Sequence, residues 1–322
     1  MRMLIETWEV VSRRMAIAVV VAVLAGCSSI SIDAAKALAT TGGDTAAAAE
    51  KSSRASDDEF GRSMMAEAFL HGTAKAVESP AYTSLLSLYE SIQRELSARA
   101  AVLQRLAGVY GAFADLASFD NSAETQKALN ELGGAINGYA SAVKASPPLS
   151  DAAIGVISTV GGLIAAEAQK RKLAEASREI RGRVAAFHTL LSAPLVKEQQ
   201  AGFQSMLLAD RKAALVLLWR AGVYEPSAII NDLGKDVGLT ARDDAAAVVT
   251  TRADSMAGLE AVVDWQIRRR HQQIERGYST SVASLQRLVA EHEKFEQGQP
   301  MDLSQLRAHV EQLRKLAEQI AK

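Results

Sequence analysis

Apolar side chains recur every three or four residues along most of the chain after residue 79, with polar residues between them. This spacing places the apolar groups on one face of a helix, so it predicts amphipathic helices. Turn signals separate these segments, as at Ser79-Pro80, Ser146-Pro147-Pro148 and Gly298-Gln299-Pro300. The predicted helices cover residues 80–119, 122–145, 151–191, 194–222, 241–297 and 302–321.

The same pattern argues against strands. No segment alternates strictly between apolar and polar residues, alanine is abundant, and aromatic residues make up only 5% of the chain. Alanine has the highest helix propensity of all residues. We therefore expect an all-α protein whose long helices, joined by short turns, pack as an elongated antiparallel bundle.

Residues 28–58 differ from the rest of the chain. They consist mainly of Ala, Ser, Thr, Gly and Asp, and almost no large apolar residue follows Ile32. Such a composition buries too little surface to offset the loss of chain entropy, so it predicts a flexible tether. A short helix packed loosely on the bundle is expected at residues 59–77.

The N-terminus carries a separate pattern. Arg13-Arg14 precedes an uncharged, mostly apolar run at residues 16–25, which ends in Leu24-Ala25-Gly26-Cys27. This run is too short to cross a hydrocarbon layer, which needs about 20 helical residues. It has the length of the apolar part of a cleaved signal peptide. The segment resembles the signal peptide and lipobox of bacterial lipoprotein precursors.

That resemblance implies three segments: a signal peptide at 1–26, a lipidated Cys27 with its tether at 27–58, and the helical bundle at 59–322. In the lipoprotein family the cysteine is acylated and becomes the first residue of the mature protein. Several acyl chains hold a protein firmly on a membrane. Ser28 after the cysteine implies the outer membrane, with the protein facing the periplasm.

Charge and cysteine content narrow the candidate functions. The formal net charge is −1, which provides no electrostatic surface for nucleic acid. Cys27 is the only cysteine, so after acylation the mature chain has no thiol and no disulfide. Its fold then depends on packing alone.

The chain carries no recognisable catalytic or metal-binding motif. None of the five histidines has a Glu three residues before it, no two are four apart, and there is no Gly-x-Ser-x-Gly or Walker sequence. His271 with Glu275 is interpreted as an exposed ion pair, His292 as part of a solvated helix end, and Arg268-Arg269-Arg270 as a solvated face. We therefore expect no enzyme activity, metal or cofactor.

Residues 152–166 form the most apolar part of the mature chain. They carry no charge, and Gly155, Gly161 and Gly162 would let another helix approach closely. One interpretation is a buried central helix. The other is half of a hairpin, residues 129–166, that inserts into a bilayer. The segment is short for a membrane span, which favours the buried helix.

Together these features predict a lipid-anchored protein of the cell envelope that acts through protein–protein contacts, as a scaffold or accessory subunit. Its expected partners are membrane lipid, through Cys27, and an envelope protein or a second copy of the chain. The alternative is a membrane-active bundle that inserts the hairpin near 129–166.

Overall fold

The computed structural model describes residues 30–74, 78–119, 121–146, 148–149, 166–194, 196–197, 211–223, 225, 227–235, 238–242, 245 and 253–321. Its main helices are α2 (Ile32–Thr73), α3 (Pro80–Leu116), α4 (Ser122–Ala142), α5 (Ala166–Ser192), α7 (Ser227–Lys235), α9 (Ala253–Glu296) and α10 (Ser304–Ala321). Residues 211–220 are helical as well. No strand occurs in these ranges, which confirms the all-α prediction. None of the helices described is both long and apolar enough to be a membrane span.

The flexible tether predicted for residues 27–58 is wrong from Ile32 onwards. A single helix, α2, runs from Ile32 to Thr73, so the predicted boundary between residues 58 and 59 falls inside it. The side chain of Ser31 caps its first turn by accepting a hydrogen bond from the Ala34 N–H at 3.3 Å. The second half is not loosely packed either, because Phe60 is fully buried.

The small polar residues of α2 are buried because the helix itself satisfies their hydroxyl groups. Thr45 donates to the carbonyl of Thr41 at 2.7 Å, and Ser56 donates to that of Ser52 at 3.0 Å. Such bonds to the preceding turn let Ser and Thr enter a core without leaving an unpaired donor. The alanines beside them allow close helix packing; the buried apolar residues of this half are Ala35, Leu38, Ala39, Ala46, Ala48 and Ala49.

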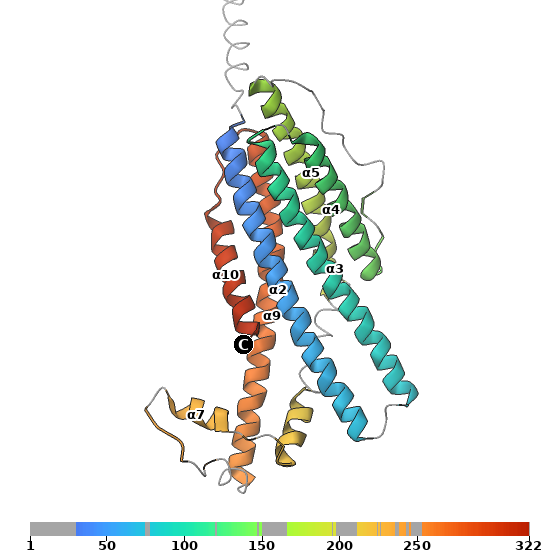
Figure 1. Ribbon diagram of the computed structural model, residues 1–322, viewed down its shortest axis with the longest axis vertical. Coiled ribbons are helices and arrows are strands. Elements are labelled where there is room, and N and C mark those ends of the chain that lie inside the picture. Colours follow the sequence, from blue (N-terminus) through green and yellow to red (C-terminus); the bar gives the residue numbers. More distant parts are fainter. Residues whose placement is uncertain are drawn as a thin grey trace, which may run out of the picture.

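The helices form an elongated bundle in which α2 packs against α3, α9 and α10 (Figure 1). α4 packs on α3, and α5 packs on α9. Successive helices α2–α3, α3–α4 and α9–α10 are antiparallel, in agreement with the predicted architecture. α4 and α5 run in the same direction, since Arg183 contacts Leu129 and, further along both helices, Phe187 contacts Tyr139.

The main core extends along these helices and contains most of the large buried side chains. Edge-on aromatic pairs join different helices within it: Phe113 to Phe295 at 6.1 Å, and Tyr139 to Phe187 at 5.5 Å between ring centroids. Burying each such side chain stabilises the fold by about 2–3 kcal/mol. Smaller apolar clusters lie outside this core, and the one around the first half of α9 is described below.

Several predictions from the sequence fall outside the described residues. These are the signal peptide at 1–26, the lipidation site Cys27, and the glycines Gly155, Gly161 and Gly162. The predicted third helix at 151–191 is described from Ala166, where α5 begins.

Candidate functional site

The candidate site lies at the end of the bundle farthest from the start of α2. There α7 and the helix at residues 211–220 pack against the first half of α9 (Figure 1). The cluster that joins them consists of Leu215, Trp219, Ile229, Ile230, Met256, Leu259, Val263 and Ile267. Arg220 strengthens the contact through two hydrogen bonds to Glu260 on α9, at 3.1 and 2.6 Å.

A cavity of about 220 Å³ opens between these elements. Five of its lining residues are apolar or aromatic: Leu215, Trp219, Ile229, Val263 and Ile267. The polar lining residues are Arg211, Glu225, Gln266 and Arg270, of which Glu225 and Gln266 are exposed to solvent. An apolar chamber with a few converging polar groups is the usual form of a small-molecule site.

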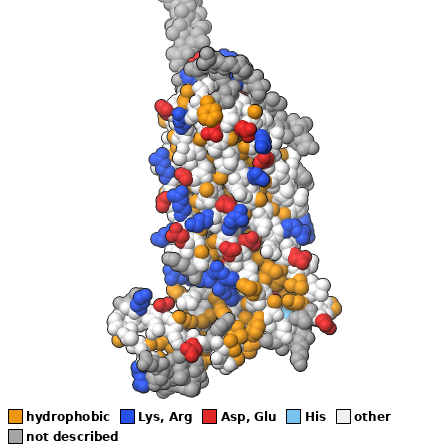
Figure 2. Space-filling view, in the orientation of Figure 1, with side chains coloured by type: hydrophobic (Ala, Val, Ile, Leu, Met, Phe, Trp, Pro, Cys, Tyr) orange, Lys and Arg blue, Asp and Glu red, His pale blue; other side chains and the backbone are white. Residues whose placement is uncertain are grey.

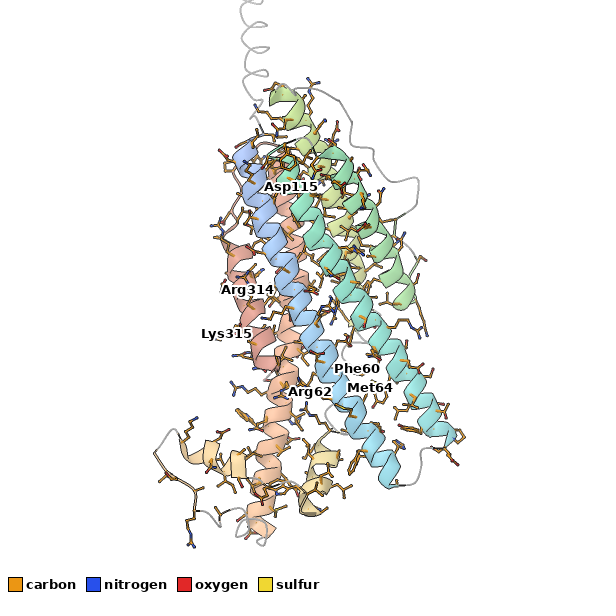
Figure 3. The ribbon with its side chains drawn as sticks, viewed as in Figure 1. Phe60, Arg62, Met64, Asp115, Arg314 and Lys315 are labelled. Atoms are coloured by element: carbon orange, nitrogen blue, oxygen red, sulfur yellow. The ribbon has the colours of Figure 1, made fainter. Side chains whose placement is uncertain are left out.

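A buried carboxylate lies beside the cavity. The side chain of Glu59 on α2 is fully buried and contacts three guanidinium groups: Arg62 at 3.0 Å, Arg270 at 3.5 Å, and Arg211. These arginines come from α2, α9 and the helix at 211–220, so the cluster ties three elements together. Figure 3 shows Arg62 on the side of α2 that faces α9, whereas Phe60 and Met64 lie toward α3.

The charges of this cluster do not balance. Three guanidinium groups surround one carboxylate, and the exposed Glu225 also lines the cavity, so one positive charge is in excess at its edge. Burial lowers the pKa of Arg211 to about 10, with a further contribution from nearby Arg270. Burial also lowers the pKa of Arg270, to which Arg62 adds. Both directions mean that the surroundings incompletely compensate these cations.

Trp219 contributes its ring to the wall of the cavity. Trp219 lines the cavity and is 6% exposed, and its Nε1–H is buried without a hydrogen-bond partner among the described residues. Buried donors in native structures are nearly always paired. Solvent does not reach Nε1, so it does not face the cavity, and the site offers two partly buried cations next to an apolar chamber, an arrangement suited to binding an anion.

The structure corrects two of the histidine predictions. His292 does not lie at a solvated helix end: it is fully buried, with its Nε2 2.9 Å from the Tyr110 hydroxyl and its Nδ1 2.8 Å from the Ser177 hydroxyl. Burial lowers its pKa from 6.5 to about 3, with a further contribution from Arg181. His271 is 4% exposed, so the predicted exposed ion pair with Glu275 is wrong as well.

The arginine run predicted as a solvated face is divided. Arg268 pairs with Asp264 at 2.7 Å, and Arg269 lies over the ring of the exposed Trp265 at 5.3 Å. Arg270 instead turns toward Glu59 and the cavity. Within the described ranges no three His, Cys, Asp or Glu side chains are grouped as metal ligands would be.

Sequence reasoning missed Glu59 and its arginines. Residues Ser52, Ser56, Glu59 and Ser63 are spaced three or four apart, so they share one face of a helix, and all four are buried. That helical spacing was the one sequence signal that this face of the helix is packed. Because the four residues are polar, the spacing was not interpreted as a buried face.

No protein-family model, no curated protein and no solved structure matches this chain.

Proposed function

We propose that the protein is a lipid-anchored lipoprotein of the cell envelope, a helical stalk that holds a protein-binding end away from the membrane. Acylated Cys27 would be the anchor, as its resemblance to a lipobox implies, and the outer membrane facing the periplasm is the location that Ser28 implies. The role is that of a scaffold or accessory subunit rather than of a catalyst.

The observation that carries this proposal is the separation of the two ends. Only residues 28–31 lie between Cys27 and α2, and the 42 residues of α2 extend along the bundle for about 63 Å at 1.5 Å per residue. The exposed large apolar residues lie mostly at the end remote from Ile32: Met65, Leu86, Leu88, Leu217, Val223, Leu233, Leu239 and Trp265. In Figure 2 the upper body carries mixed charges, and apolar side chains gather below.

Such a distribution suits a stalk. Contiguous apolar surface on a water-exposed protein commonly marks a site of protein contact. The tip of the α2–α3 hairpin, defined here by Met65, Leu86 and Leu88, presents part of this surface. These side chains are 67%, 37% and 44% exposed. We propose that the hairpin tip contacts the partner.

The alternative function, insertion of a hairpin near residues 129–166, receives less support. The described part of that hairpin is α4, whose Leu129, Leu132, Ile136 and Tyr139 are at most 1% exposed in the main core. Insertion would first have to remove these side chains from the bundle.

The test has one readout for the anchor and one for the binding end. Labelled palmitate should be incorporated into the wild-type chain and not into Cys27→Ser, and only the wild type should sediment with membranes. A photo-crosslinking amino acid at position 86, in the hairpin tip, should give a discrete adduct in cells. The same amino acid at position 119, where exposed Phe119 follows α3 near the anchor end, should not. Absence of palmitate from the wild type would overturn the anchor, and equal adducts at both positions would overturn the binding end.

A further inference from the structure

We propose that the cavity beside α9 binds a small amphiphilic anion: an aliphatic or aromatic body in the apolar chamber, with a carboxylate held by Arg211 and Arg270. This inference goes beyond the proposed function, because it assigns a small-molecule site that neither the lipid anchor nor the hairpin tip requires.

The size of the chamber limits the ligand. An apolar cavity of about 150 Å³ holds benzene, so about 220 Å³ has room for a ligand of roughly ten non-hydrogen atoms. The walls formed by Leu215, Ile229, Val263 and Ile267 offer no polar side-chain group. The body of the ligand is therefore apolar, on the scale of a medium acyl chain or one substituted aromatic ring.

The polar groups determine the charge of the ligand. Arg211 and Arg270 have side chains that are 16% and 24% exposed, and both already contact Glu59. A guanidinium carries five N–H donors and no acceptor, so each arginine retains donors beyond those that Glu59 uses.

These donors favour an anion over a neutral or cationic ligand. Glu59 and the exposed Glu225 balance two of the cluster's three positive charges, which leaves one in excess. A carboxylate matches the planar fork of a guanidinium through two parallel hydrogen bonds. It would compensate the excess positive charge at a point where burial disfavours it.

Octanoate has the required size and charge and serves as the probe. Isothermal titration of the full-length Cys27→Ser chain, which lacks the acyl acceptor, should give saturable one-site binding in buffer without detergent. Octanol and octylamine have the same body without the anion, and they should bind at least tenfold more weakly. The indole NMR signal of Trp219, whose ring lines the cavity, can be assigned with Trp219→Phe; it should shift with octanoate, and octanol should need at least tenfold higher concentration for the same shift.

Three variants locate the binding. Arg270→Gln should weaken the binding of octanoate at least tenfold and leave the binding of octanol unchanged. Ile229→Phe, which fills the chamber, should abolish octanoate binding, whereas Leu233→Phe on the exposed side of the same helix, 62% exposed, should not. The Ile229→Phe comparison keeps the test decisive if Arg270→Gln fails to fold.

Two results would overturn the inference: no saturation at millimolar octanoate, or equal binding of octanoate, octanol and octylamine. Retention of octanoate binding in Ile229→Phe would also overturn it, because the ligand would then lie elsewhere. Palmitate labelling of Cys27 and crosslinking at position 86 are unaffected by any of these outcomes, so the anchored-stalk proposal stands or fails separately.

Discussion

The ring of Tyr110 lies against the backbone of Gly42 so closely that a β-carbon at position 42 would be 2.3 Å from its Cε1 atom. Tyr110 is fully buried in α3, and its hydroxyl lies 2.9 Å from Nε2 of His292 on α9. The absent side chain of Gly42 therefore sets the distance between α2 and α3, and through Tyr110 it positions α9.

We expect Gly42→Ala to destabilise the protein by about 2–3 kcal/mol, because Tyr110 has no free space to move into and overpacking strains a core. The adjacent Gly43 is the matched control, since its added β-carbon would meet Tyr110 at an ordinary 3.6 Å. Gly43→Ala should be neutral or stabilising by up to about 1 kcal/mol through helix propensity. Urea unfolding of both variants measures the difference. Equal stabilities would contradict the packing described here.

Gly42 also shows why α2 was not predicted from the sequence. Thr40-Thr41-Gly42-Gly43 has the composition of a flexible segment, and the apolar surface that orders it belongs to other helices, including Tyr110. Where a helix carries its own stripe of large apolar residues, the sequence was sufficient to predict the helix and its limits. α3, α4 and α10 begin and end close to the predicted limits, with Ser79-Pro80 at the start of α3 and Gly298-Gln299-Pro300 before α10.

The candidate site could not be predicted from local sequence patterns. Glu59 and Arg270 are 211 positions apart, and the spacing of polar residues around Glu59 indicates a packed face without indicating what packs on it. Only the packing of α2 against α9 brings them together. The parallel direction of α4 and α5 likewise depends on tertiary contacts such as that of Arg183 with the Leu129 carbonyl.

His292 makes the stability of the fold depend on pH. Its pKa is about 3 in the folded state against 6.5 in an unfolded chain, so the unfolded state binds the proton more readily. The stabilisation is complete above pH 6.5 and is lost as the pH falls toward 3. The slope approaches about 1.4 kcal/mol per pH unit only below pH 6.5, so the free energy of unfolding should fall by about 2 kcal/mol between pH 6.5 and pH 4.5.

His292→Gln should flatten this dependence, because glutamine can still bond Tyr110 or Ser177 but does not titrate. His71→Gln, at a side chain outside this network, is the control for the loss of a histidine elsewhere in the chain. Urea denaturation across the pH range measures all three chains. A wild-type slope in His292→Gln would assign the acid sensitivity to other groups.

Removing the negative charge of Glu59 should lower the free energy of unfolding, because three arginines surround it. Glu59→Gln leaves Arg62, Arg211 and Arg270 together without their carboxylate, and breaking a buried ion cluster typically costs about 3–5 kcal/mol. Glu50→Gln removes a carboxylate from the same helix, where it pairs with Arg54 one turn away. That change should cost less than about 0.5 kcal/mol. Thermal melting compares the stabilities of the two variants. Similar losses of stability would mean that the Glu59 cluster stabilises the fold no more than a surface ion pair does.

The hairpin tip permits a test of function without loss of stability. Leu88 is 44% exposed, so Leu88→Glu should change the free energy of unfolding by no more than about 0.5 kcal/mol. If the tip contacts a protein partner through its apolar surface, a buried glutamate there should reduce the adduct formed by a crosslinker at position 86 at least tenfold.

Phe119→Glu places the same charge on another exposed apolar residue, 58% exposed, near the anchor end of the bundle. It should leave the adduct unchanged. An adduct that survives Leu88→Glu would show that the partner does not use this apolar surface, whereas equal loss in both variants would reflect net charge rather than the position of the tip.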